Sequence, residues 1–317
     1  MGKILSVREA VDLLLQGQIV GLPTETVYGL GADATNESAV ASIFKAKNRP
    51  SFDPLIVHVP TLAAVSEIAE LSTEAEQLFL AFSPGPLTVI LPKKKSIPDL
   101  VTSGHATVAV RIPSHPLMLH VLRSSGLYIA APSANPFGFT SPTTAQHVLD
   151  QLGSVVPGVV DGGPSSVGIE STIVDMSSDV FKVLRLGGMA LEQLENVLGP
   201  IPTQLSSSNP NAPGMLSSHY NPGITIRLFD DRTALLEALK RDDSNTIGIL
   251  YWGESIHHGG SSFNLSTRCS DTEAAGALFK GLRYLGATAV TEVYAHLLPE
   301  YGLGRAINDR LQRAANK

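Results

Sequence analysis

Ten residues with cationic or hydrogen-bonding side chains lie near the ends of predicted strands. They are Thr26, Lys47, Arg49, His58, Arg111, Ser133, Asn135, Ser141, Ser171 and Arg185. Each alone is most simply a surface charge or a loop hydroxyl. Together they describe a cleft rich in donors, with no evident nucleophile and no paired carboxylates. Such a cleft suits the binding of two anionic partners and their positioning for phosphoryl or nucleotidyl transfer.

Residues 126–144 are the stretch around which this cleft is organised. Residues 127–131 form a short apolar run that predicts a buried strand, and Pro132 ends it. A polar loop follows. Ser141 then resembles an N-cap, so a helix is predicted near 142–152. A helix N-terminus beside a strand end is an anion site in outline. An ordinary strand-to-helix connection needs the same cap, and the residues alone leave both interpretations open.

Length, charge and cysteine content limit the class of protein. A chain of 317 residues exceeds the usual size of a single core and predicts two domains. The formal net charge of -6 argues against a broad surface that coats nucleic acid. Cys269 is the only cysteine, which excludes an intramolecular disulfide and a multi-cysteine zinc site. With no signal-peptide pattern and no apolar span of about 18 residues, we expect a cytoplasmic protein without a membrane segment.

Helix and strand patterns alternate over residues 1–200, the first predicted domain. Ser6 and Glu9 form a capping box at the start of the first helix. The predicted helices are 6–17, 37–47, 61–69, 73–82 and 142–152. The predicted strands are 18–22, 55–59, 87–91, 107–112, 127–131, 171–175 and 181–186. Residues 23–33 are predicted to be a loop because they are dense in hydroxyls and glycines.

A segment rich in proline interrupts this alternation. Residues 199–223 contain five prolines and almost no helical or strand period, which is typical of a linker or a functional loop. We place the linker at 201–223. Beyond it, strands are predicted at 224–229, 246–251 and 287–293, and helices at 232–241, 272–286 and 303–316. The alternation in this second domain, 224–317, suits a small doubly wound parallel sheet.

Two nucleotide-binding patterns are incomplete. Residues 163–168 have the glycine spacing of a P-loop, but Ile169 and Glu170 stand where lysine and serine or threonine would be required. Residues 29–34 resemble a dinucleotide fingerprint, yet the preceding strand ends several residues earlier and Asp53 lies in a proline-rich loop. These short motifs therefore do not identify the ligand of the cleft.

A longer series of motifs resembles one family. In chain order the motifs occupy residues 23–32, 47–50, 54–58, 84–88, 110–113, 131–135, 141–143 and 168–173. They resemble the signatures of the YrdC-type threonylcarbamoyl-AMP synthases over about residues 5–200. Segments 212–215 and 219–222 are similar to the interdomain linker of the long, two-domain form. The resemblance implies an α/β fold: a YrdC-like twisted mixed sheet with helices, followed by a small Rossmann-like doubly wound C-terminal domain.

The resemblance also implies an activity. The substrates would be ATP, L-threonine and bicarbonate, and the products threonylcarbamoyl-AMP and pyrophosphate. Mg2+ is expected to be held through the ATP phosphates, with no metal ligand from the protein. Downstream threonylcarbamoyl-transferase enzymes would then pass the group to an adenosine of tRNA. Whether tRNA binds this chain directly stays open.

Residue roles follow from the same resemblance. Those expected to act in catalysis are Lys47, Arg49, Ser133 and Asn135. Those expected to bind ATP are Arg49, Asp53, Thr107, Ser133, Asn135, Ser141, Arg185 and Tyr220. Those expected to bind threonine are Thr26, His58, Arg111, Ala131 and Ser171. Arg111 would clamp the threonine carboxylate, and Tyr220 would close over the nucleotide as part of a lid. Lys45 is interpreted as solvated.

Two alternatives belong to other classes of protein. The first is a tRNA-binding module without catalysis. The second is an enzyme that uses carbamoyl phosphate, because YrdC-like domains also occur in hydrogenase-maturation proteins. That alternative predicts zinc-finger segments, which one cysteine cannot build. The sequence leaves open the role of the C-terminal domain, the oligomeric state and whether the linker moves during turnover.

Overall fold

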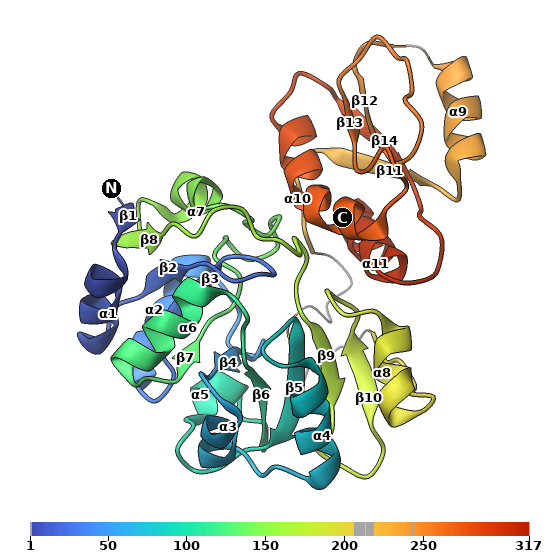
Figure 1. The fold of residues 1–317 in the computed structure, drawn as a ribbon. Helices are drawn as coiled ribbons and strands as arrows, with labels where there is room; N and C mark the ends of the chain where they lie inside the picture. Colours follow the sequence, from blue (N-terminus) through green and yellow to red (C-terminus); the bar gives the residue numbers. More distant parts are fainter. Residues whose placement is uncertain (1, 206–212, 214–218, 243, 317) are drawn as a thin grey trace.

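Two α/β units make up the chain (Figure 1). The computed structural model describes residues 2–205, 213, 219–242 and 244–316. The first unit is built on a mixed sheet and the second on a smaller parallel sheet, as the sequence predicts. Of the predicted linker, residues 206–212 and 214–218 lie outside the described residues, and with them all of the 212–215 motif except Pro213.

A ten-stranded sheet is the scaffold of the first unit within the described ranges, in the order β1-β8-β2-β3-β7-β4-β6-β5-β9-β10. The strands are β1 (Lys3–Leu5), β2 (Val20–Leu22), β3 (Gly29–Asp33), β4 (Ile56–His58), β5 (Leu87–Pro92), β6 (Thr107–Arg111), β7 (Ile129–Ala130), β8 (Gly158–Val160), β9 (Thr172–Asp175) and β10 (Lys182–Arg185). β4 and β6 run parallel with His58 opposite Arg111, so these two residues lie side by side at one end of the sheet.

The helices of this unit follow the predicted order with additions. They are α1 (Val7–Leu15), α2 (Glu37–Lys47), α3 (Leu62–Ile68), α4 (Thr73–Phe82), α5 (Asp99–Thr102), α6 (Pro116–Ser125), α7 (Ala145–Leu152) and α8 (Leu191–Leu198). The capping box of α1 is confirmed, because the Ser6 hydroxyl accepts from Glu9 N and the Glu9 carboxylate accepts from Ser6 N. α2 ends in left-handed Asn48 (φ 51°), which turns the chain directly after Lys47.

The predicted N-cap at Ser141 is wrong. α7 begins at Ala145, and Thr144 caps it by accepting from His147 N at 3.3 Å. The Ser141 hydroxyl instead donates to Glu170 Oε1 at 2.5 Å. A hydrogen bond from a hydroxyl to a charged carboxylate is stronger than one that the hydroxyl accepts from a backbone N–H. The buried carboxylate of Glu170 therefore determines where Ser141 points.

The predicted loop 23–33 contains strand β3. Strand propensity does not predict β3, because glycine is depleted in strands and β3 contains two glycines. A Cβ at Gly31 would lie 2.6 Å from Leu22 Cδ1, and one at Gly29 would lie 3.1 Å from Ala131 Cβ. The glycines therefore permit close packing of neighbouring strands. β1 and α6 were also not predicted from sequence patterns.

The second unit is a doubly wound parallel sheet, as predicted. Its described strands have the order β11-β14-β12-β13 and pair in parallel. The elements are β11 (Thr225–Phe229), α9 (Arg232–Arg241), β12 (Ile247–Tyr251), β13 (Ser262–Asn264), α10 (Asp271–Gly286), β14 (Glu292–His296) and α11 (Gly304–Ala315). One sheet face packs on α9, and the other on α10 and α11. β14 lies later than the predicted strand 287–293 because residues 287–291 form the turn after α10.

Helices α10 and α11 pack against the first unit, and one apolar cluster includes side chains of both units, such as Val110 and Leu278. Three arginines of these helices donate across the boundary: Arg283 to Thr140 O, Arg305 to Glu192 Oε1 and Arg310 to Glu170 Oε2. Among the described helices, none combines the length and apolar character that crossing a membrane requires.

Candidate active site

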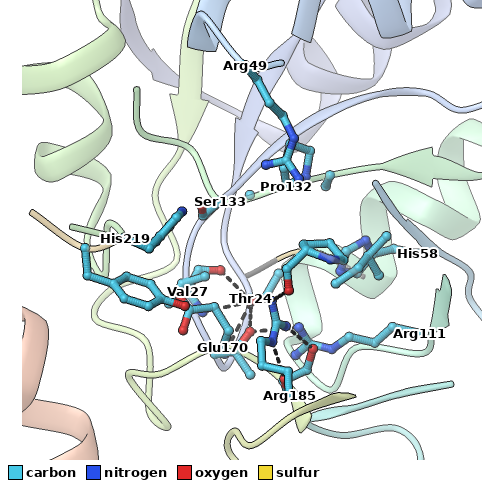
Figure 2. A pocket seen from close by; sticks show the side chains of 17 residues that line it. Thr24, Val27, Arg49, His58, Arg111, Pro132, Ser133, Glu170, Arg185 and His219 are labelled. Atoms are coloured by element: carbon cyan, nitrogen blue, oxygen red, sulfur yellow. Dashed lines mark hydrogen bonds between the residues drawn. The ribbon is translucent and has the colours of Figure 1, made fainter. Parts of the chain in front are cut away.

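A cavity lies where strand ends of the first unit meet the linker (Figure 2). Its volume is about 50 Å³, which is room for a few water molecules. Nine of the predicted site residues line it: Thr26, Arg49, His58, Arg111, Ala131, Ser133, Ser171, Arg185 and Tyr220. Pro213, His219 and Tyr220 bring the linker into its wall. The predicted convergence of distant motifs is therefore present for these nine residues.

Three guanidinium groups reach the cavity from separate elements (Figure 2). Arg49 follows α2, Arg111 ends β6 and Arg185 ends β10. Each is buried. Their convergence brings many N–H donors to one cavity, which suits two anionic ligands held close together.

Arg111 is held by a buried ion pair and a hydroxyl group. Its Nη2 donates to Glu25 Oε1 at 2.6 Å, and its Nη1 donates to Thr26 Oγ1 at 2.8 Å. Burial alone would raise the pKa of Glu25, but the charge and the hydrogen bond of Arg111, together with backbone donors, outweigh it and the pKa is lowered. Glu25 was not predicted. It neutralises part of the charge of Arg111 and fixes the plane of its guanidinium.

His58 lies beside Arg111 on the neighbouring strand. Burial, with the charge of Arg111, lowers the pKa of His58 to about 3. The imidazole is therefore neutral at physiological pH and can serve as a neutral donor or acceptor toward a ligand.

Arg49 is held by the turn that follows it. Its Nε donates to Asp53 O at 3.1 Å, its Nη2 donates to Pro54 O at 2.9 Å, and the same Nη2 pairs with Asp53 Oδ2 at 2.9 Å. Asp53 does not line the cavity. Its position fits a role in orienting Arg49.

Lys47 and Asn135 lie behind the cavity wall. Lys47 is fully buried, and its Nζ donates to the carbonyls of Ser133 and Asn135. Burial, with the charge of Arg49, lowers the pKa of Lys47 well below its usual range. The Asn135 amide donates to Pro136 O and Phe139 O, each at 2.8 Å. Both side chains fix the 133–139 loop and neither lines the cavity.

Arg185 and Ser171 form the floor near the linker. Arg185 Nε donates to Ser171 O and its Nη2 to Ser171 Oγ, both at 3.0 Å, while its Nη1 donates to Pro213 O at 3.2 Å. Burial lowers the pKa of Arg185 to about 10, so it stays cationic at neutral pH. Glu170 lies beside this pair and also lines the cavity.

Five predicted residues do not line the cavity: Lys47, Asp53, Thr107, Asn135 and Ser141. Lys47, Asp53 and Ser141 contact residues that do, as described above, and the backbone N–H of Asn135 donates to the lining residue Ser133 at its carbonyl oxygen, at 3.0 Å. Thr107 is different, because it begins β6 and pairs with Pro92, whereas Arg111 ends the same strand. Its proposed contact with the nucleotide stays a prediction.

Four lining or contacting residues with polar side chains were not predicted from the sequence: Thr24, Glu25, Glu170 and His219. All four fall in or beside motifs that were recognised. The two carboxylates had a detectable signal, because several buried arginines require counter-charges.

Comparison with known proteins defines the class. A family profile described as telomere recombination matches residues 12–187, and a profile of the threonylcarbamoyl-AMP synthase C-terminal domain matches residues 189–316. E. coli YciO, at 21% identity, covers 59% of this chain with a TM-score of 0.53 and shares the fold of the first unit. The chain is thus an α/β protein with a YrdC-type unit joined to a second, family-specific domain.

Relatives that match over nearly the full length identify the family. The threonylcarbamoyl-AMP synthase of Bacillus subtilis is 40% identical over 98% of this chain and 92% of its own length. That of Pyrococcus abyssi is 37% identical over 98% of this chain and 94% of its own. A crystal structure of P. abyssi Sua5 complexed with L-threonine has a TM-score of 0.92 at 37% identity, covering 98% of this chain and 94% of that one. The chain belongs to the threonylcarbamoyl-AMP synthase family.

Family membership confirms the predicted enzyme class, a nucleotidyltransferase that forms threonylcarbamoyl-AMP. The match extends through the C-terminal domain, which the hydrogenase-maturation alternative does not account for.

Proposed function

We propose that this cavity is the place where threonylcarbamoyl-AMP forms, with L-threonine and ATP bound side by side. Threonine would lie at the Arg111 end, where Thr26, His58, Ala131 and Ser171 surround it. ATP would lie toward Arg49, Ser133 and Arg185. The observation that carries this assignment is the convergence of three buried guanidiniums in one cavity. The threonine-bound P. abyssi relative supports threonine as one ligand.

The reaction requires mainly that the protein positions the substrates and stabilises negative charge. The neutral amine of threonine adds to bicarbonate with loss of water, or to carbon dioxide with loss of a proton, and gives a carbamate. A carbamate oxygen then attacks the α-phosphorus of ATP, the bond from that phosphorus to the bridging oxygen breaks, and pyrophosphate leaves. Negative charge gathers on phosphoryl oxygens in the transition state, so Arg49 and Arg185 would stabilise it. Because His58 is neutral, it would not add a second positive charge beside Arg111 near the amine of threonine.

Magnesium would arrive on the ATP phosphates. In the described ranges, no group of three or more His, Cys, Asp and Glu side chains is arranged to hold a metal ion. The nearby carboxylates Glu25, Asp53 and Glu170 each pair with an arginine. The donor set thus fits an anionic ligand that brings its own cation. Bound in this way, magnesium would supply charge neutralisation on the phosphates.

The linker would have to move to admit the nucleotide. The present volume of about 50 Å³ is far below the several hundred Å³ of an ordinary ligand pocket, roughly 300–1,000 Å³. Tyr220 and His219 occupy the wall that would open. Closure of the same residues over ATP would exclude water from the carbamate and the mixed anhydride.

The product would be passed to downstream transferases that modify tRNA, in the cytoplasm. Direct binding of tRNA to this chain is not required by the proposal.

The test is incubation of the purified chain with ATP, magnesium, L-threonine and bicarbonate, with pyrophosphate and the adenylate followed by mass spectrometry. We expect pyrophosphate release that depends on both threonine and bicarbonate. ATP consumption that ignores threonine, or none at all, would contradict the proposal and favour a module without catalysis.

A further inference from the structure

Arg310 of α11 enters the first unit and reaches the wall of the cavity. It is fully buried although it belongs to the C-terminal domain. Its Nε and Nη2 donate to Glu170 Oε2 at 3.2 and 3.1 Å, and its Nη1 donates to Leu186 O at 2.5 Å. Glu170 is 140 residues away in the sequence. The two domains thus share one buried ion pair at the active site.

Glu170 connects Arg310 to the cavity. Its carboxylate lines the cavity, and its other oxygen, Oε1, accepts from the Ser141 hydroxyl at 2.5 Å. Burial would raise the pKa of Glu170, but Arg310, Arg185 and Ser141 outweigh it, so its pKa is lowered. Glu170 is therefore an anion in the wall of a cavity that we assign to anionic substrates, and Arg310 is its principal counter-charge.

The C-terminal domain also holds the segments around this pair. The Arg310 guanidinium lies over the ring of Tyr220, 5.6 Å from its centroid, and the ring of Phe279 in α10 stacks with Tyr220 at 5.3 Å. On the loop that carries Glu170, a Cβ at Gly168 would lie 2.5 Å from Gly276 Cα of α10. Only a residue without a side chain fits there. The loop and Tyr220 thus both pack against the second unit.

We propose that Arg310 is a positioning residue for the reaction: the C-terminal domain supplies it to neutralise and orient Glu170, so that Ser141 and the ATP side of the cavity are set correctly. This inference rests on the proposed function, because it takes the cavity to be the ATP site. It gives the C-terminal domain a task inside the active site, beyond that of a neighbouring fold.

The physical reason is electrostatic. Removing one partner of a buried ion pair leaves an uncompensated charge. Without Arg310, the Glu170 carboxylate would face the triphosphate as a like charge and would be free to turn away from Ser141. ATP carries more negative charge than threonine, so its binding should suffer more.

The experiment compares Arg310→Met with Arg305→Met in the full-length chain, using steady-state pyrophosphate release. Arg305 lies on the same helix and also pairs across the domain boundary, with Glu192 at 2.6 Å, but Glu192 does not line the cavity, whereas Glu170 does. We expect Arg310→Met to raise the KM for ATP by about tenfold or more, with a smaller change in the KM for threonine. Arg305→Met should keep both KM values near those of the wild type.

A third variant, Arg310→Met/Glu170→Gln, separates charge from packing. The glutamine can still accept from Ser141 but carries no charge, so we expect the KM for ATP of the double variant to return most of the way to the wild-type value. Should Arg310→Met not fold, Arg310→Lys replaces it, because lysine keeps the charge but not the bidentate geometry, and a raised KM for ATP is again expected.

Wild-type KM values in the folded Arg310 variant, or a double variant no better than the single one, would overturn the inference. So would equal effects of Arg305→Met and Arg310→Met. Failure of the proposed function has a different signature, because the wild-type chain itself would then release no threonine-dependent pyrophosphate.

Discussion

The arginines of the cavity are oriented by the protein before any substrate binds. Arg49 donates to backbone carbonyls, Arg111 pairs with Glu25, and Arg185 donates to Ser171 and Pro213. A guanidinium has five N–H donors, so such bonds fix its plane and leave it able to bind an oxyanion. Donors fixed in this way need little reorganisation as charge develops on the phosphate.

Removing one of these donors should lower turnover while the fold survives. We expect Arg185→Ala to reduce kcat by about 10²–10³, or ~2.7–4 kcal/mol of transition-state stabilisation. Arg49→Ala should do the same and should also lower stability, because it leaves Asp53 buried without its partner. Pyrophosphate release and circular dichroism measure the two effects.

The control for both variants is Arg8→Ala, which removes an exposed arginine. Near-normal turnover in both cavity variants would count against the assignment of the cavity as the reaction site.

His58 gives the protein a defined response to acid. Its pKa is lowered to about 3 in the folded state by burial and Arg111, whereas a histidine in an unfolded chain titrates near about 6.5. Between these values the unfolded state binds more protons. Stability therefore falls as the pH drops below about 6.5, by up to roughly 1.4 kcal/mol per pH unit from this residue, and is independent of His58 above it.

Urea denaturation between pH 7.5 and 5 measures this slope. His58→Gln should flatten it, and exposed His120→Gln should leave it unchanged. Equal slopes in His58→Gln and the wild type would show that His58 does not contribute.

At the residue scale, the sequence predicted the donors of the cavity but not their acceptors. Arg111 and Arg185 were found because they end strands, which is a pattern along the chain. Glu25 and Glu170 were missed because the pattern of donors along the chain indicates where anions bind, but not which carboxylates neutralise the buried arginines themselves. Ser141 was misplaced for the same reason, since its acceptor is Glu170.

Among the elements, the loop from 168 to 171 depends on the close approach of α10. Gly168 has φ +78°, and a Cβ there would lie 2.7 Å from Ala275 O. Gly168→Ala should therefore lose about 1–2 kcal/mol of stability for the left-handed backbone and roughly a further 1–3 kcal/mol for the displaced helix. Since the loop carries Glu170, turnover should fall as well.

Gly163→Ala is the matched control. Gly163 has a similar φ of +76°, but a Cβ there would meet no atom within 4 Å. Gly163→Ala should therefore lose only the stability that the left-handed backbone costs. Thermal melting of the two variants measures the difference, and identical losses would mean that α10 does not constrain the loop.

Element prediction succeeded where apolar period and caps agree. α1 and α2 begin and end within a few residues of their predicted bounds. β3 was missed because its glycines serve packing against Leu22 and Ala131, contacts that exist only once the sheet has formed. Tertiary packing thus overrides local propensity at the strand that leads into the site.

For the whole molecule, the shared core predicts that the two units unfold together. Side chains of both units belong to one apolar cluster, and Arg310 and Glu170 form a buried pair between them. Trp252, the only tryptophan, lies in the second unit. We expect its fluorescence and the far-UV circular dichroism to change at the same urea concentration. An earlier fluorescence transition that leaves most of the dichroism intact would show independent domains.

The sequence indicated two domains and a linker but not how they depend on each other. The linker can be recognised in the sequence because the prolines that define it lie together within residues 199–223. The contact between Arg310 and Glu170 joins residues 140 positions apart, and no spacing rule in a single sequence connects them.

That ion pair limits how such enzymes can be recombined. A chimera that joins the first 200 residues of this chain to the tail of a relative would inherit Glu170 without assurance of a guanidinium to meet it. Domain exchange should therefore yield active hybrids only when the donor tail carries an arginine at the place of Arg310, and inactive hybrids should be repairable by restoring that one side chain.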